Sequence, residues 1–253
     1  MEGYRSSLNR IFKLAGEDYS ASPALEMLFK QIKKSFDRNT IQVPHWDVNI
    51  VLLALKEPPY EPAWDPPLVE FTMETLFFVS LATANRVSEI AALSDQVGWA
   101  PYDSIVLSFA PRFLAKNESY SHSVRRVFKI PPLSSLTDDP NELLLCPVRA
   151  LKYYLKLTKC NGCADRLFVS PRNLYRPLST NAISYFLRST ISNSFLSVPD
   201  QSQRLTRVNA HEIRAVATSL RFKYNISHVN IIRRAFWRSY SIFCSRYLKR
   251  YIS

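Results

Sequence analysis

The sequence predicts an α+β protein that is mostly helical and carries a small β-sheet or hairpin insert. Several long stretches have apolar residues at helical spacing, and they lie on either side of one pair of β-rich runs. The 253 residues include only four glycines, whereas repeated β-turns and phosphate-cradling loops both depend on glycine. An all-β fold and a P-loop nucleotide enzyme are therefore disfavoured.

The N-terminal region predicts two helices. Residues 22–36, "SPALEMLFKQIKKSF", place apolar side chains on one stripe after a Ser-Pro start, and residues 43–56, "VPHWDVNIVLLALK", repeat the pattern with Asp47 as the cap. The segment that follows, "EPPYEPAWDPP", contains five prolines in eleven residues, which neither a helix nor a central strand tolerates. We therefore expect a short helical piece at residues 1–62 and a main domain at residues 63–253.

The main domain begins with a helical pair, "LVEFTMETLFFVSLATANRVSEIAALS", which is broken around Ala84 and Asn85. Asparagine is one of the few residues besides glycine at ease in a left-handed turn. The β-rich runs "DSIVLSF" and "RRVFKIPPL" follow, separated by the long polar connection 110–124, and they predict an antiparallel pair. Helical patterns then resume over residues 146–159, 179–195 and 209–224, and two short helices are expected within 227–251.

The charge is strongly positive and uneven. The chain has 33 Lys and Arg against 21 Asp and Glu, a net +12, and from Gln201 to Ser253 there are eleven basic residues and one acid. This excess suits a polyanion, either nucleic acid or an anionic membrane surface, although a solvated basic face is the plainer alternative.

The sequence gives little support for a secreted, a membrane-spanning or a metal-binding protein. The start of the chain lacks the apolar run of a signal peptide, and the most apolar segment, "ETLFFVSLATANR", is too short to span a bilayer. "CNGC", at residues 160–163, has the spacing of half a metal site without a second pair, so a turn is the better interpretation. We expect an intracellular protein with reduced thiols and no metal, cofactor or small-molecule substrate.

Two pairs of polar residues each share one face of a predicted helix. His211 and Arg214 are three apart on one predicted helix, and Arg86 and Glu89 have the same spacing after the break. Taken singly, each pair has an ordinary explanation: a helix start with a surface arginine, or a surface ion pair.

In their order along the chain, these motifs resemble the tyrosine recombinases, a family of DNA strand-transfer enzymes. The matching motifs are "LATANRVSEIAALS", "AHEIRAVATS", and a tryptophan followed by "FCSRYL". The segment "PHWDVNIVLLALKEPPYEP" is similar to one that precedes the first arginine in the recombinases of DIRS-like retrotransposons. The resemblance covers roughly residues 4–251 and implies the family's mostly helical catalytic domain behind an N-terminal piece that is shorter than the family's DNA-clamping domain.

The resemblance also implies a catalytic set. Arg86 and Arg214 would clamp the scissile phosphate, a role that suits the guanidinium fork. His211 would help to take the proton from the nucleophile, Tyr247, and Trp237 would donate its indole N–H to a phosphate oxygen. A lysine of the β-hairpin would protonate the leaving 5′-oxygen, and we choose Lys116, with Lys129 as the rival.

The implied function is cleavage and rejoining of double-stranded DNA through a 3′-phosphotyrosyl intermediate, for a mobile element in the nucleus. The family works as dimers or tetramers on DNA, and this reaction needs neither a metal nor a nucleotide. The alternative is a DNA-binding module that no longer cleaves. This sequence departs from the family in having Ala84-Asn85 where relatives commonly have glycine before the first arginine, and in the six residues that follow Tyr247.

Overall fold

The computed structural model describes residues 46–61, 67–115, 126–159, 165–196, 198 and 208–223, together with residues 10, 13, 14, 16, 22, 23 and 27. By its contacts the chain divides into two units, Met1–Gln42 and Val43–Ser253. Most of the first unit, including most of the helix expected over residues 22–36, lies outside the described residues.

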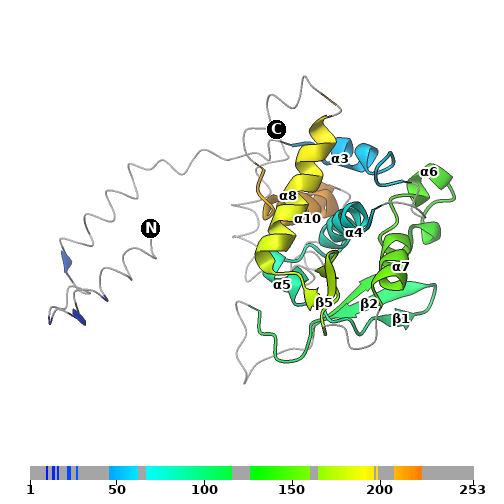
Figure 1. The fold of residues 1–253 in the computed structure, drawn as a ribbon. Coiled ribbons are helices and arrows are strands. Elements are labelled where there is room, and N and C mark those ends of the chain that lie inside the picture. Colours follow the sequence, from blue (N-terminus) through cyan, green and yellow to red (C-terminus); the bar gives the residue numbers. More distant parts are fainter. Residues whose placement is uncertain are drawn as a thin grey trace. The chain divides into compact units, whose positions relative to one another are not determined.

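Helix α4 (Leu68–Thr83) is the centre of the fold. It is surrounded by α7 (Pro147–Thr158), α8 (Thr180–Leu196) and α10 (Glu212–Lys223), as Figure 1 shows. Residues Phe71 to Ser80 of α4 are all buried. A helix that is covered on every side has no polar face to present to water, which explains why this stretch is the most apolar of the chain.

Helix α3 (Val48–Ala54) packs against α8. The expected cap is confirmed, because the Asp47 side chain accepts a hydrogen bond from the Asn49 N–H at 2.9 Å. Residues 46–61 thus lie in the second unit and pack on its helices, while the proposed division of the chain at residue 62 stays a prediction.

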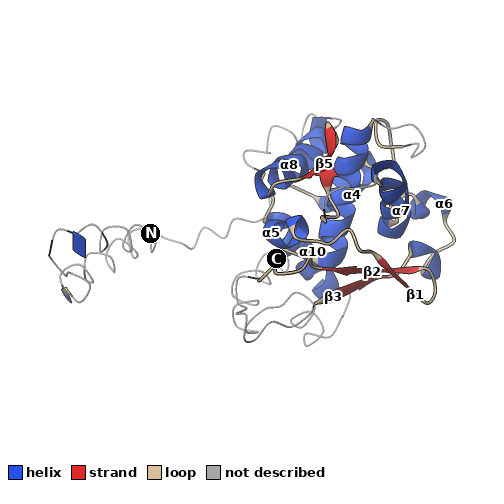
Figure 2. Cartoon of the chain, turned by 60° about the horizontal axis from the view of Figure 1, so that its bottom comes forward, coloured by secondary structure: helices blue, strands red, loops and turns tan. Residues whose placement is uncertain are grey.

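A three-stranded antiparallel sheet lies beside the helices (Figure 2), in the order β1 (Gly98–Ala100), β2 (Ser104–Ser108), β3 (Val127–Ile130). The expected pairing of the two β-rich runs is confirmed: Ile105 lies opposite Ile130 and Leu107 opposite Phe128, and all four side chains are buried. Strand β1 was not predicted, because three residues are too few to show an alternating pattern.

The remaining elements are short and lie between the long helices. They are α5 (Val87–Ala91), η2 (Leu133–Ser135), α6 (Pro140–Leu143) and the hairpin of β4 (Val169–Ser170) and β5 (Asn173–Pro177). The β4–β5 hairpin and α6 were also missed by the sequence analysis. The predicted fold class is confirmed, since the described chain is mostly helical with small antiparallel sheets.

Candidate active site

A left-handed residue turns the chain from α4 into the candidate site. Ala84 has φ 54° and ψ 29°, and its N–H donates to the Ser80 carbonyl oxygen at 2.9 Å. The expected break is therefore present, but the left-handed residue is Ala84, not the asparagine that follows it. Asn85 is buried, and within the described residues neither polar atom of its amide has a hydrogen-bond partner.

Arg86 then begins α5 and is held by Glu89, three residues on. The Arg86 backbone N–H donates to Glu89 Oε2 at 2.8 Å, and its guanidinium Nη1 donates to Oε1 at 2.8 Å. Glu89 is only 1% exposed. The surface ion pair that this spacing usually indicates is thus ruled out, because the carboxylate is in the interior and bound at both oxygens.

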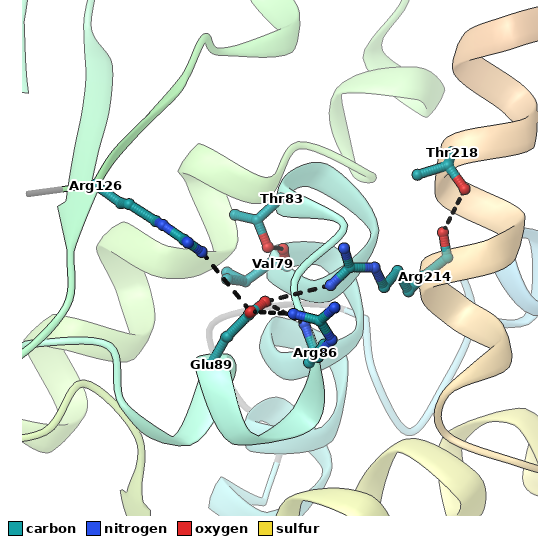
Figure 3. Close-up of polar contacts among 7 residues, drawn as sticks. All are labelled: Val79, Thr83, Arg86, Glu89, Arg126, Arg214 and Thr218. Carbon is teal, nitrogen blue, oxygen red and sulfur yellow. Dashed lines mark hydrogen bonds and ion pairs between the residues drawn. The ribbon is translucent and has the colours of Figure 1, made fainter. Parts of the chain in front are cut away.

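Two more arginines reach the same carboxylate from distant parts of the chain, as Figure 3 shows. Arg214 of α10 lies 125 residues from Glu89 in sequence, and its Nη1 is 3.4 Å from Glu89 Oε2. Arg126, directly before β3, places its Nη1 3.9 Å from Glu89 Oε1. The side chains of Arg214 and Arg126 are 6% and 8% exposed, whereas that of Arg86 is 26% exposed and meets solvent. We call these four residues the arginine cluster.

The arginine cluster gathers three guanidiniums around one largely buried carboxylate. Guanidiniums keep their charge at any physiological pH and present paired N–H donors that match a phosphate or carboxylate. The arrangement can therefore bind an oxyanion through the exposed side of Arg86.

The helix that carries Arg214 is fixed at its first turn by a contact from the N-terminal part of the second unit. The Trp46 indole Nε1–H donates to Glu212 Oε2 at 3.0 Å, and both residues are buried. One turn further along α10, the Thr218 hydroxyl donates to the Arg214 carbonyl oxygen at 2.8 Å. Sequence analysis missed the role of Trp46, although this residue lies in the "PHWDVN" segment on which part of the resemblance depends.

His211 lies directly before α10 and is exposed. Its backbone N–H donates to Asn209 Oδ1 at 3.1 Å, and the Glu212 N–H donates to the Asn209 carbonyl oxygen at 2.9 Å. This turn presents the imidazole to solvent three residues before Arg214.

The structure thus brings together two of the six predicted catalytic residues, Arg86 and Arg214, and places a third, His211, at the start of the same helix as Arg214. Lys129, the rival general acid, is exposed on β3. The other three predicted residues, Lys116, Trp237 and Tyr247, lie outside the described residues, so their roles stay predictions.

The sequence analysis missed two members of the arginine cluster. Glu89 was noted only as a pair for Arg86, and its spacing gave no sign that other cations would join it. Arg126 carried no signal at all, because its neighbour Arg125 and the basic composition of the chain make it ordinary in sequence.

Two findings concern only the described part of the chain. It contains no group of three or more His, Cys, Asp or Glu side chains placed to hold a metal ion. Among the same residues no helix has both the length and the apolar character needed to cross a lipid bilayer. The "CNGC" segment is not among them.

No family model matches the chain, and neither does any curated protein. Among solved structures, the chain is similar to XerA recombinase, with 15% identity, a TM-score of 0.46, and coverage of 100% of this chain and 87% of that one. It is also similar to a lambda integrase(75–356) dimer bound to a COC′ core site, with 14% identity, a TM-score of 0.45, and coverage of 81% and 57%. For the lambda integrase dimer bound to a COC′ core site, the identity is 15%, the TM-score 0.44 and the coverage 80% and 46%. The chain thus spans about half the length of the lambda integrase chains that it matches.

Proposed function

We propose that this chain cleaves and rejoins double-stranded DNA as a tyrosine recombinase. The observation that carries the proposal is the convergence of Arg86 and Arg214 on Glu89, since 125 residues separate Glu89 and Arg214 in sequence. The resemblance to the tyrosine recombinases implies that both arginines bind one phosphate, and their meeting on Glu89 supports this. A pair of surface arginines with separate roles would have no reason to meet on one buried carboxylate.

In the proposed ground state, Arg86 and Arg214 bind the non-bridging oxygens of the scissile phosphate. The charge that develops on these oxygens during attack is then met by donors that are already in place, which is the most effective form of electrostatic catalysis. Glu89 holds the two guanidiniums together and limits their mutual repulsion.

The proposed reaction is a balanced exchange of phosphoester bonds. The Tyr247 oxygen attacks phosphorus and forms the phosphotyrosyl bond, while the bond from phosphorus to the 5′-oxygen breaks. His211 helps to accept the tyrosine proton, and Lys116 or Lys129 supplies a proton to the departing 5′-oxygen. Trp237 donates its indole N–H to a phosphate oxygen. The reverse attack by a 5′-hydroxyl rejoins the strand, so no nucleotide is consumed.

The proposal includes the DNA partner, the assembly on DNA and the biological role. Duplex DNA is the proposed partner, and the net charge of +12 supports it because each phosphate that is neutralised releases counterions. We further propose that copies of the chain assemble on DNA as dimers or tetramers, and that the activity serves the integration of a DIRS-like mobile element in the nucleus. The "PHWDVNIVLLALKEPPYEP" segment supports this last point.

Covalent trapping tests the proposed function. The protein is incubated with a duplex nicked close to candidate element termini, denatured, and analysed for protein linked to DNA. We expect a linked band from the wild type, no band from Tyr247→Phe, and an unchanged band from the matched control Tyr251→Phe. An Arg86→Gln variant should reduce the rate about 10²–10³-fold, which is the usual effect of losing one charge-stabilising donor.

The same experiment separates the proposal from its alternative. If the wild type binds duplex in a salt-sensitive manner but gives no linked band, the chain is a DNA-binding module without cleavage activity. If the band survives in Tyr247→Phe and is lost in Tyr251→Phe or Tyr240→Phe, the reaction class stands and the nucleophile is wrong.

A further inference from the structure

A pocket of about 470 Å³ lies where the last turn of α7 meets the segments that lead into β1 and β4. It shares no residue with the arginine cluster. The aliphatic part of its lining comes from four residues, Val97, Leu155, Leu167 and Val169. This size, and the combination of apolar walls with a few polar groups, are typical of a site that receives a ligand or a side chain of a partner.

The polar part of the lining is mainly cationic. Lys156, Lys159 and Arg166 line the pocket, and Asp95 is the one acid among the lining residues that the structure describes. Neither lysine forms an ion pair with a described residue. Arg166 Nε lies 3.7 Å from Asp165 Oδ1, and its buried Nη1 has no hydrogen-bond partner in the described chain. A carboxylate that enters from outside would therefore find cationic donors that no other group occupies.

The β1–β2 hairpin places two exposed aromatic side chains at this pocket. Trp99 lines it and is 56% exposed, and Tyr102, in the turn of the hairpin, is 86% exposed. Tyr102 and Asp103 have φ values of 62° and 55°, in the left-handed region that residues other than glycine rarely adopt. Strained backbone of this kind is found at functional surfaces, and exposed Trp and Tyr are typical anchors of protein–protein contacts. The surface therefore suits a protein partner.

We call this surface the hairpin pocket, and it consists of Trp99, Tyr102, Lys156, Lys159 and Arg166 together with the aliphatic lining.

The chain itself carries a segment of matching character, residues 136–139, "LTDD", directly before α6. Leu136 is 76% exposed, and Asp138 and Asp139 are both exposed. Neither aspartate forms an ion pair with any residue that the structure describes. The turn has a fixed shape, because the Leu136 N–H donates to the Leu133 carbonyl oxygen at 2.8 Å and the Asn141 N–H to Asp139 Oδ1 at 2.9 Å. We call residues 136–139 the acidic turn.

The acidic turn cannot reach the hairpin pocket of its own copy. The turn precedes α7, whereas the pocket lies at the opposite end of this helix, and twelve helical residues span about 18 Å. The Leu133 N–H donates to Cys146 Sγ at 3.3 Å, which holds the segment at the start of α7. A contact between the two surfaces must therefore join two copies of the chain.

We propose that the acidic turn of one copy occupies the hairpin pocket of the next. Leu136 enters the aliphatic lining, and Asp138 and Asp139 pair with Lys156 and Lys159. The two surfaces differ, so the contact is head-to-tail, and each copy can use its turn on one neighbour and its pocket on another. This inference deepens the proposed assembly of copies and rests on it for the setting on DNA, although the contact itself needs no DNA.

Sedimentation velocity of the whole 253-residue chain without DNA tests the contact. We expect the mean mass of the wild type to rise with protein concentration and to fall as salt is added, because exposed ion pairs are screened. The pocket variant, Lys156→Glu with Lys159→Glu, and the turn variant, Asp138→Lys, should each weaken association about tenfold or more, since like charges then face each other.

The matched control changes the charge of the chain as much as the pocket variant does, but at a different place. It is Arg172→Glu with Arg176→Glu, in the exposed part of the β4–β5 hairpin, and it should associate as the wild type does. A control that loses association as the pocket variant does would overturn the inference, because the effect would then follow from net charge alone.

A mixture of the pocket variant and the turn variant tests the head-to-tail geometry. The first keeps an intact acidic turn and the second keeps an intact hairpin pocket, so one wild-type contact can form between them and no further copy can join. We expect dimers in the mixture at concentrations where each variant alone is monomeric. A mixture that associates no more than its components overturns the inference, as does a wild type that is monomeric at every concentration.

A second measurement needs no variant and covers the case in which one of them does not fold. Equal amounts of wild-type chain with and without nitrogen-15 are mixed and treated with a carbodiimide, which couples a carboxylate to a lysine in contact with it. We expect linked peptides that join the acidic turn to Lys156 or Lys159 and that carry the label on one side only. Links in which both peptides always come from the same copy would overturn the inference.

These outcomes are separate from those of covalent trapping. A chain that associates through the acidic turn but never links to DNA keeps this inference and loses the proposed reaction. A chain that links to DNA, and whose two variants do not associate when mixed, keeps the reaction and loses the inference.

Discussion

Helix α4 is flanked by two charged clusters of opposite composition, one rich in arginine and one rich in glutamate. The arginine cluster, just beyond its C-terminal end, has three guanidiniums for one carboxylate. The second cluster, near the middle of the helix, has the buried carboxyl groups of Glu74 and Glu61 beside one guanidinium, that of Arg149. We call these three residues the acidic cluster. Both clusters lie in the second unit, but only the acidic cluster can lose charge by taking up a proton.

The acidic cluster relieves its excess internally. Burial, together with the charge of Glu61, raises the pKa of Glu74 from 4.5 to about 9, while Arg149 opposes the shift. Glu74 is therefore protonated and neutral at pH 7, and the ion pair of Arg149 with Glu61 is balanced. Burial likewise raises the pKa of Tyr60, which adjoins this cluster; a hydrogen bond with Asn193 opposes the shift, and Glu70 and Glu74 add to it.

The arginine cluster cannot become neutral by a change of protonation. Carboxylates can take up a proton when burial makes their charge costly, but guanidiniums remain charged. A buried carboxyl group can thus become neutral and serve a purely structural role, whereas the guanidiniums around Glu89 keep their charge, which suits the binding of an anion. This difference is the physical reason to assign function to one cluster and not to the other.

Removing the carboxylate of the arginine cluster should have the largest effect. Glu89→Gln removes the carboxylate that all three guanidiniums approach, and breaking a buried ion pair in this way costs about 3–5 kcal/mol of unfolding free energy. Urea unfolding measures the loss, and added phosphate should restore part of it. Glu142→Gln, on the exposed surface of α6, is the control and should stay within about 0.5 kcal/mol of the wild type. Equal costs for the two variants would contradict the comparison.

The acidic cluster should instead make the free energy of unfolding depend on pH. Since the pKa of Glu74 is about 9 in the folded state and 4.5 as its ordinary value, the folded state holds one more proton between these limits. The contribution of Glu74 to the free energy of unfolding is therefore greatest below about pH 4.5 and declines as the pH rises toward 9, by at most about 1.4 kcal/mol per pH unit.

Glu74→Gln removes this titration. The variant should match the wild type at pH 5 and exceed its unfolding free energy by up to about 3 kcal/mol at pH 7, as measured by urea unfolding across this range. If the unfolding free energies of the two proteins change with pH in parallel, Glu74 is not protonated in the folded state at pH 7.

The contrast between the clusters also explains what the sequence could predict. Local signals sufficed for the Asp47 cap, the antiparallel pairing of β2 with β3, and the break at Ala84. They also placed Arg86 at the start of a helix. Each of these depends on residues close in sequence or on a period of two or 3.6.

The clusters depend on contacts between distant segments, and composition says nothing of these. Arg126 is one of 33 basic residues, and only the folded chain shows that it meets Glu89. Glu74 is an ordinary glutamate in sequence, and its protonation follows from complete burial beside Glu61. Arg214 was predicted from the H-x-x-R motif that the family resemblance supplies. Its distance from Arg86 in the sequence carries no information about their contact with Glu89.

The two clusters are joined through the segment that contains Trp46 and Glu61, and Trp46→Phe tests this connection. The change removes the indole hydrogen bond to Glu212 at the start of α10, and a hydrogen bond to a charged group contributes about 1.5–3 kcal/mol. We expect a loss of this size in thermal unfolding, with weaker phosphate binding because α10 carries Arg214.

Trp99→Phe provides the control for this variant. Trp99 is 56% exposed, and Lys152 Nζ lies 5.1 Å from the centre of its ring, an exposed cation–π contact that is worth about 0.5–1 kcal/mol. Its replacement should leave phosphate binding unchanged. A Trp46→Phe variant that behaves like Trp99→Phe would mean that α10 is held by its helical packing alone.

The smallest effect concerns the residue that separates the two clusters. Ala84 lies in the left-handed region at φ 54°, a conformation that costs an L-residue about 1–2 kcal/mol. Glycine would remove this cost, but it also increases the conformational entropy of the unfolded chain, which offsets part of the gain in stability. Ala84→Gly should therefore raise the unfolding free energy by about 0.5–1 kcal/mol, as measured by thermal unfolding. Ala82→Gly, two residues earlier and still within α4, should lower it by a similar amount because glycine weakens a regular helix. Opposite signs at two alanines this close would identify the left-handed turn as a strained position, retained at the point where the chain leaves α4 for the arginine cluster. Equal losses at both positions would show instead that the chain leaves α4 without this turn.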